Sequence, residues 1–403
     1  TATIDTSETV TELATLSAVG GTNDLTIVIR AADATASTAA QLNTINAATA
    51  LAVNLTNVTA LAGSSLSDLE TLASAITLNE FSNDDGLTTI ALTDTSIDAT
   101  TLASTIDNYD TINGGATTGM TLVSGVSINV DASEITEMLA DESAGRLTIA
   151  DQVITVNSAA TISVDTANLL EATTTGVVTA SITTTESVSE LNTLTGTNGA
   201  YTIVVSGADA TTTTAAEFNT LNGKTTVAID LTNVTALAGS SLSDLGTLAT
   251  AIGNNEFSND TGLTTIAVTD TTIDATTLAS TIDSYDSING GATTGMTLAS
   301  GATINVDAGE VTEMLADETD GRLTIVDQVI TVTNPISVDT ANLLGATTTG
   351  KLTATIATSE TVTELATLSA DGGTNDLTIV IRKADAISAT AAQLNTINAA
   401  TAV

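Results

Sequence analysis

The chain has 403 residues, 42% of them hydrophobic, and carries 47 acidic residues against seven basic ones, for a formal net charge of -40. This charge excludes nucleic acid and anionic membrane surfaces as partners, because both need Lys and Arg gathered on one face. The absence of Cys and His removes disulfides, thiolate chemistry and most structural zinc. No apolar run reaches the roughly 18 residues of a membrane span, so no such span is predicted.

Long internal repeats run through the sequence. Residues 55–69, LTNVTALAGSSLSDL, recur unchanged as residues 231–245, an offset of 176. Residues 1–51 return with seven differences as residues 353–403, so a window cut from a longer tandem array is expected. The sequence therefore predicts three repeat blocks, the first two with six units each and the third only begun: 1–178, 179–352 and 353–403.

Each unit begins with a strand signal, in which aliphatic residues alternate with Thr, Ser, Ala or Asn. Leu25, Ile27 and Ile29 would share one face of such a strand, as would Ile90 and Leu92. The same alternation predicts further inward pairs: Val53/Leu55, Ile128/Val130, Ile162/Val164, Ile203/Val205 and Val227/Ile229.

A helix start signal follows each strand, namely Ser, Thr or Asp before apolar residues spaced three or four apart. The spacing of Leu66, Leu69 and Leu72 places these side chains on one side of a short helix. Six Asp residues at strand-to-helix boundaries are interpreted as helix N-caps: Asp98, Asp131, Asp165, Asp274, Asp307 and Asp339. Helix starts are predicted near residues 7, 37, 65, 98, 132, 166, 185, 211, 241, 274, 308, 340, 359 and 388.

Units of about 29 residues cannot bury their own apolar face, so they stack on one another. We therefore expect an α/β solenoid of stacked strand and short-helix units, with a parallel sheet on one side. About 14 such turns, at the strand spacing of a sheet, would form an elongated rod.

Threonine recurs on the outward face of the predicted strands, for example at Thr26, Thr89 and Thr353. Stacked, these side chains would form a ladder of hydroxyl and methyl groups able to bind ice or a surface glycan. Threonine is also an ordinary β-favouring residue for a soluble face or for a face that contacts another chain. Both interpretations stay open, although the unequal unit lengths spoil the strict period that a lattice would need.

Two acidic turns are candidates for a calcium site. They hold Asn83, Asp84 and Asp85 in the first block, and Asn259 and Asp260 in the second. Calcium takes about six to eight oxygen ligands from flexible loops. Asn, Asp and Gly are also the residues of any tight turn, so turn formation is the alternative. No other cofactor is predicted.

No arrangement of residues predicts catalysis. Adjacent carboxylates such as Asp141 and Glu142 could be offered as a glycosidase pair, but a chain with 47 acidic residues produces such pairs by chance. If the chain had a catalytic cleft, the irregular units at 141–178 and 317–350 would be the places to expect it. Because no residue pattern indicates catalysis, the chain is predicted not to be an enzyme.

The segments SETVTELATL, LTNVTALAGSSLSDL and INVDASEITEMLAD lie in near-identical blocks rich in Thr and Ala. In this style the whole chain resembles the repeat regions of giant bacterial secreted surface proteins, such as cyanobacterial and other marine exoproteins, adhesins and surface-layer-like proteins. The resemblance implies secretion, an extracellular or cell-surface location, and a mechanical or adhesive role; it transfers no functional residue. The partners expected are copies of the chain itself, in head-to-tail or lateral filament contacts, and surface glycans.

Overall fold

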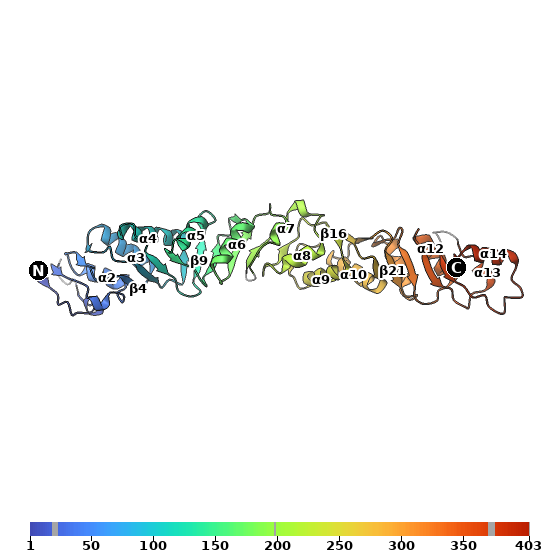
Figure 1. Cartoon of the computed structure of the whole chain (residues 1–403), viewed down its shortest axis with the longest axis horizontal. Coiled ribbons are helices and arrows are strands. Elements are labelled where there is room, and N and C mark those ends of the chain that lie inside the picture. The colour runs from blue at the N-terminus through green and yellow to red at the C-terminus, as the bar shows by residue number, and fades with distance from the viewer. Residues whose placement is uncertain (18–22, 197–198, 370–374, 403) are drawn as a thin grey trace. The chain divides into compact units, whose positions relative to one another are not determined.

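The computed structural model describes residues 1–17, 23–196, 199–369 and 375–402. These residues form short strands and helices that alternate along the chain in two compact units (Figure 1). Within the described ranges, every helix is too short or too polar to cross a membrane. The units are unit 1, Thr1–Thr183 with Leu194–Thr202, and unit 2, Thr184–Thr193 with Ile203–Val403.

The strands described in unit 1 all pair in parallel, and they form four sheets. The strands are β1 (Ala2–Thr3), β2 (Leu25–Thr26), β3 (Val53–Asn54), β4 (Ala60–Ser64), β5 (Phe81–Ser82), β6 (Thr89–Leu92), β7 (Ser96–Asp98), β8 (Gly119–Thr121), β9 (Ser127–Val130), β10 (Leu147–Thr148), β11 (Val153–Val156), β12 (Thr161–Ile162), β13 (Val178–Ile182) and β14 (Ala200–Thr202). The sheets have the orders β1-β2, β3-β5, β4-β6-β8-β10 and β7-β9-β11-β13-β12, with β14 on β13.

Unit 2 repeats this arrangement, again with parallel pairing. Its strands are β15 (Ile229–Asp230), β16 (Ala236–Ser240), β17 (Phe257–Ser258), β18 (Thr265–Val268), β19 (Thr272–Asp274), β20 (Gly295–Leu298), β21 (Thr303–Val306), β22 (Leu323–Thr324), β23 (Val329–Val332), β24 (Leu352–Thr355) and β25 (Asp376–Thr378). The sheets have the orders β15-β17, β16-β18-β20-β22 and β19-β21-β23-β24-β25.

A helix closes each turn, and the described residues contain fourteen α-helices near the fourteen predicted starts. Unit 1 holds α1 (Val10–Leu13), α2 (Ala39–Ala47), α3 (Leu66–Thr77), α4 (Ala99–Ile112), α5 (Ile135–Ser143) and α6 (Val164–Thr173). Unit 2 holds α7 (Val188–Leu191), α8 (Ala215–Asn222), α9 (Leu242–Gly253), α10 (Ala275–Ile288), α11 (Val311–Thr319), α12 (Val338–Thr347), α13 (Val362–Leu365) and α14 (Ala391–Ala399). Two short 3-10 helices also occur, Ala31–Asp33 and Gly207–Asp209.

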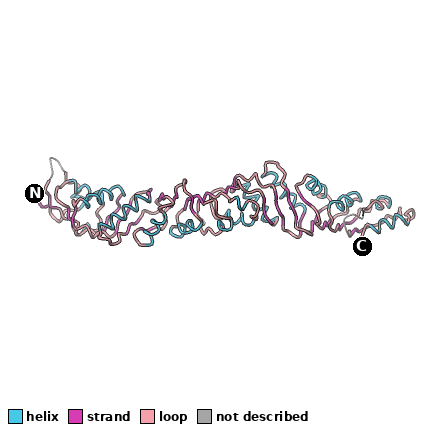
Figure 2. The backbone as a smooth tube through the Cα atoms, turned by 90° about the horizontal axis from the view of Figure 1, so that it is seen from above, coloured by secondary structure: helices cyan, strands magenta, loops and turns pink. Residues whose placement is uncertain are grey.

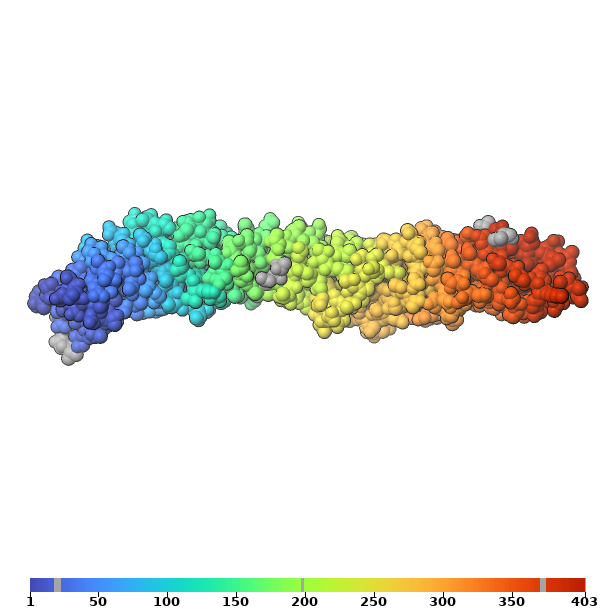
Figure 3. All heavy atoms as spheres, turned by 60° about the horizontal axis from the view of Figure 1, so that its bottom comes forward, coloured from blue at the N-terminus to red at the C-terminus, as the bar shows by residue number. Residues whose placement is uncertain are grey.

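The α/β solenoid prediction is confirmed. Successive helices and successive strands within a unit pack on their neighbours in chain order, and the helix and strand segments alternate in the backbone view (Figure 2). Within each unit the colours of the space-filling view follow one another in bands, as expected when a turn contacts only the turns beside it (Figure 3). Consecutive strands of one turn can belong to three different sheets, as β5, β6 and β7 do.

Apolar side chains from strand and helix meet in the interior of each turn. Leu69 and Leu72 of α3 are fully buried, as the helix spacing predicted, and so is Ile90 of β6. Two predicted strand positions are wrong, although the side chain of Val164 is buried as expected. Val164 is the first residue of α6, because Ser163 already caps that helix, and Val227 precedes β15 and is exposed.

The prediction of Asp N-caps is right at only two of the six positions. Asp98 and Asp274 accept a hydrogen bond from the third residue of α4 and α10. Asp165 and Asp339 instead lie in the first helical turn behind a Ser cap, where a carboxylate still opposes the positive end of the helix dipole. The last two, Asp131 and Asp307, precede helices whose N-cap positions are Glu134 and Glu310.

Candidate functional site

Arg146 joins three carboxylates from two helices. Its guanidinium lies 3.2 Å from Asp107 and 2.9 Å from Asp110, both on α4, and 3.1 Å from Asp141 on α5. The Asp141 side chain is only 7% exposed, and the Arg146 side chain 27%. Arg146 therefore cross-links the helices of two neighbouring turns from a mostly buried position.

The same arrangement recurs around Arg322. This guanidinium lies 2.8 Å from Asp283, 2.5 Å from Asp286 and 2.7 Å from Asp317. All four residues are the counterparts of the first cluster at the offset of 176 in the sequence. Each unit thus contains its own copy of the same ion-pair network, made of identical residue types.

A glycine turn brings each Arg back to its helix. Gly145 follows α5 with φ of 74°, a left-handed conformation that strains a residue with a side chain. The amide of Arg146 then donates to the Asp141 carbonyl at 2.9 Å, which closes the helix end. Gly321 has φ of 75° and does the same before Arg322.

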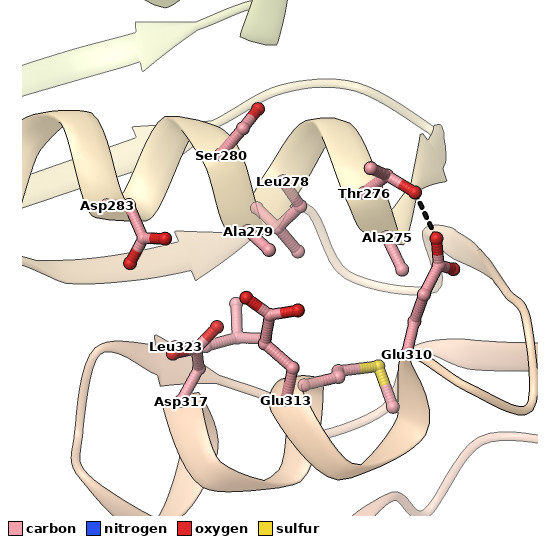
Figure 4. A pocket seen from close by; sticks show the side chains of 11 residues that line it. Ala275, Thr276, Leu278, Ala279, Ser280, Asp283, Glu310, Glu313, Asp317 and Leu323 are labelled. Atoms are coloured by element: carbon pink, nitrogen blue, oxygen red, sulfur yellow. Dashed lines mark hydrogen bonds between the residues drawn. The ribbon is translucent and has the colours of Figure 1, made fainter.

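An acidic groove lies between α10 and α11 (Figure 4). It is a cavity of about 170 Å³ whose lining includes Asp283, Glu310, Glu313 and Asp317. The Thr276 hydroxyl donates to the Glu310 carboxylate across its mouth. A matching cavity of about 200 Å³ lies between α4 and α5, lined by the equivalent acidic residues Asp107, Glu134 and Glu137.

Burial changes the pKa of the most deeply buried carboxylate beside each arginine. It raises the pKa of Asp141 above 3.8, and the charge of Arg146 opposes only part of that effect. Asp317 behaves in the same way beside Arg322. The hydrogen bond to Asp286 is the main cause that raises the pKa of Arg322 itself. The arginine charge therefore favours the ionised form of both aspartates, against the effect of burial.

The contacts of Asp141 bear on its pairing with Glu142. The Asp141 carboxylate is bound to Arg146, whereas Glu142 is the next residue along the same helix. Side chains of consecutive helical residues point in different directions, so these two carboxyl groups do not face one another as a glycosidase pair does. Asp141 instead takes part, through Arg146, in the ion pairs that connect α4 and α5.

The calcium candidates lie in tight turns after short strands. Asn83 and Asn259 adopt left-handed conformations, with φ of 53° and 55°. The Asn83 amide donates to the Asn54 side chain at 3.1 Å. In the described part of the chain, no three His, Cys, Asp or Glu side chains come together in a way that could hold a metal ion. Calcium binding at Asn83, Asp84 and Asp85, and at Asn259 and Asp260, stays a prediction.

The outward threonines form short rows. In one sheet Thr155 pairs with Thr179, and Asn129 and Ala200 continue that row on either side. Thr89 stands between Ala60 and Gly119, Thr26 pairs with Thr3, and Thr353 stands between Thr331 and Asp376. Binding of ice or glycans by a threonine ladder would have to use these interrupted rows, and stays a prediction.

A second kind of helix cap was not predicted from the sequence. The amide of the first residue of a helix donates to a side chain of the next turn, as Ala39 does to Ser64 at 2.9 Å and Leu66 to Asp94 at 2.9 Å. Equivalent bonds in unit 2 join Ala215 to Ser240, Leu242 to Asp270 and Val188 to Asp209. The recurrence of these residues at the repeat offset was the available signal, as it was for the two arginines.

No protein-family model matches the chain, and a search of curated proteins found no relative.

Proposed function

We propose that the chain is a structural repeat segment of an extracellular filament, adhesin stalk or surface layer, and that it assembles by head-to-tail stacking of copies. The observation that supports the proposal is that several of the few arginine and tyrosine side chains connect neighbouring turns. Arg146, Arg322 and the tyrosines Tyr109 and Tyr285 all join one turn to another. Because these few basic and aromatic side chains hold neighbouring turns together, the chain is suited to a mechanical role.

Open strand edges supply a means of assembly. Among the described residues, β1 pairs with β2 alone within unit 1, and β25 pairs with β24 alone within unit 2. Unpaired strand edges are templates for further parallel strands. Stacking of one copy on another would continue the pairing that already joins the turns within a unit.

The net charge of -40 sets the conditions for this assembly. Copies repel one another at low ionic strength, and the Debye length shortens to about 8 Å at physiological salt. Stacking is therefore expected to strengthen with added salt. Secretion into a saline or divalent-rich medium fits this requirement.

Electron microscopy of the purified chain, with sedimentation velocity across salt concentrations, tests the proposal. The expected result is filaments or oligomers that lengthen with protein concentration and with salt. A matched sample at low ionic strength is the control, because repulsion should keep it monomeric. A chain that stays monomeric at high concentration and high salt would contradict the proposal.

A further inference from the structure

A side-chain amide connects the end of α8 to the turn that follows it. Asn222, the last residue of α8, donates from its Nδ2 to the carboxylate of Glu256, which lies 34 residues later in the chain. The carbonyl of Glu256 accepts the amide of Ile229 at 3.0 Å, where β15 begins to pair with β17. The side chain of Asn222 is therefore bonded to the residue from which this strand pairing starts.

Unit 1 contains the same junction with one difference in sequence. The side-chain amide of Asn46 on α2 donates to the Glu80 carboxylate at 2.6 Å, and the Val53 amide donates to the Glu80 carbonyl at 3.0 Å. Asn46 is followed by Ala47, whereas its counterpart in unit 2 is followed by Gly223. The two junctions thus form a matched pair within one chain.

The glycine matters because of the chemistry of asparagine. The backbone nitrogen of the next residue can attack the side-chain carbonyl carbon of Asn, and the side-chain nitrogen leaves as ammonia, taking the proton of the attacking N–H. The ring that forms is a succinimide, and water opens it at either carbonyl to give Asp or isoaspartate. The conversion uses one water and releases one ammonia. Glycine permits it fastest, because it has no side chain to hinder the attack and the most mobile backbone.

Two other Asn-Gly pairs lie wholly within the described residues, and both are protected. Asn113 is 7% exposed and Asn289 is 6% exposed. The side-chain amide of each donates to a carbonyl and to a hydroxyl in the interior: Leu87 and Thr118 for the first, Leu263 and Thr294 for the second. Burial and these two partners hold each amide away from water and from the following glycine.

Asn222 is more accessible than these two residues. It is half-buried, and it lines two surface cavities of about 490 and 320 Å³. The Gly223 amide donates to the Thr220 carbonyl at 3.2 Å, in the last turn of the helix. Helix ends fray, and the opening of this single turn frees both the attacking nitrogen and the side chain that it attacks.

We propose that Asn222 is a modification site at which the folded chain deamidates, and that the product loosens the junction between α8 and the next turn. The new carboxyl group at position 222 has no N–H to donate to Glu256. It faces the Glu256 carboxylate instead, and two carboxylates at such a distance repel one another. Because the conversion is irreversible, the loosened junction accumulates with the age of the chain.

Peptide mass mapping of the incubated full chain tests the site. At mildly alkaline pH, Asn222 is expected to convert at least about tenfold faster than Asn46 and than the two buried asparagines. A zero-time sample corrects for conversion during digestion. Gly223→Ala should slow the reaction to the rate at Asn46, and an added Cβ there meets only the Thr220 carbonyl, at 3.4 Å. A rate at Asn222 that is no higher than at Asn46, or that Gly223→Ala leaves unchanged, would overturn the proposal.

Asn222→Asp reproduces one product and reports its effect on the junction. Amide exchange at Ile229, whose acceptor is the Glu256 backbone, should quicken at least about tenfold in this variant. Adding Glu256→Gln should restore the protection, because the Gln amide can donate to the new carboxylate. Exchange at Ile229 equal to that of the parent chain, or quickened equally with and without Glu256→Gln, would show that the modification does not loosen the junction by repulsion, and the proposal would fail.

Discussion

The hydroxyl of Tyr109 on α4 donates a 3.0 Å hydrogen bond to the carbonyl oxygen of Leu69 on α3, 40 residues earlier. Tyr285 makes the equivalent bond to Leu245 at 3.1 Å in unit 2. Both tyrosines are fully buried, and burial raises their pKa above 10. The phenol is therefore a neutral donor at any physiological pH, and it ties one helix to the helix of the turn before.

Tyr109→Phe removes this bond and little else. The expected loss is about 1 kcal/mol of unfolding free energy, the usual net value of one intramolecular hydrogen bond. Tyr285→Phe should lose a similar amount, measured by urea unfolding. Ser104→Ala on the same helix is the control, since that exposed hydroxyl bonds only within α4, and it should change stability far less. Equal losses in all three variants would contradict a role specific to the buried phenols.

Arg322→Leu leaves Asp317 buried without its counter-charge. We expect a loss of about 2 to 4 kcal/mol at pH 7, because an uncompensated buried carboxylate is costly. Adding Asp317→Asn should recover part of that loss, because the most deeply buried of the three carboxylates then carries no charge.

The penalty of Arg322→Leu should depend on pH. Burial already raises the pKa of Asp317 above 3.8, and removing Arg322 raises it further. A raised carboxyl pKa in the folded state means that stability is lost as pH rises through that value, so the penalty shrinks toward acid pH. Unfolding curves of the variant and the parent at pH 4 and pH 7 measure this difference. A penalty that grows on acidification would be the contrary result.

Three capping boxes give the opposite pH dependence. A backbone amide donates to a Glu carboxylate at 2.7 to 2.8 Å in each, and this bond is the largest cause that lowers the pKa of the Glu below 4.5. The pairs are Thr9/Glu12, Ser187/Glu190 and Thr361/Glu364. A lowered pKa gives stability that is present above the unfolded value and lost as pH falls through the folded one.

Replacement of all three glutamates by Gln should therefore flatten the acid side of the stability profile below about pH 4.5, where the parent chain weakens. Thermal unfolding between pH 3 and pH 7 checks this. Glu70→Gln, an exposed helical Glu outside any capping box, serves as the control. An unchanged acid profile in the triple variant would count against the capping carboxylates as its source.

Ser64→Ala tests the caps that come from the next turn. Ser64 is 2% exposed, and its hydroxyl accepts the Ala39 amide, so the substitution leaves that buried amide without a partner. A loss of about 1 to 3 kcal/mol is expected, with the same from Ser240→Ala. Ser74→Ala, which removes an exposed hydroxyl bonded within α3, should have little effect. If Ser64→Ala is as mild as Ser74→Ala, the cap contributes nothing to cohesion between turns.

The calcium prediction is tested by metal removal. A site at Asp84 and Asp85 would raise the melting temperature with increasing Ca²⁺, by mass action on the folded state, and a chelator would reverse the rise. Asp85→Asn should reduce the response, while Mg²⁺ at the same ionic strength controls for screening of the net charge. A melting temperature equally sensitive to both ions would reject a specific site.

The positions of the helices could be read from the sequence because their signals are local. The Ser or Thr cap and the apolar spacing lie within one turn, as in Ser65 with Leu66 and Leu69. The Asp caps were harder to assign, because Ser163 and Asp165 compete for the same helix end and only the backbone path decides between them. Alternation likewise failed at Val164, where that helix had already begun.

The sequence by itself determined the repeat, the strand and helix order, and most of the buried aliphatic positions, with Val227 as an exception, since these follow from periodicity within about 29 residues. Only the tertiary structure decided how one turn holds the next. Arg146 and Asp107, Tyr109 and Leu69, and Ala39 and Ser64 are 25 to 40 residues apart, and their meeting depends on the length of each turn and on the division of its strands among sheets. Local sequence patterns do not show which residues of neighbouring turns will meet, because these contacts form only when the turns stack.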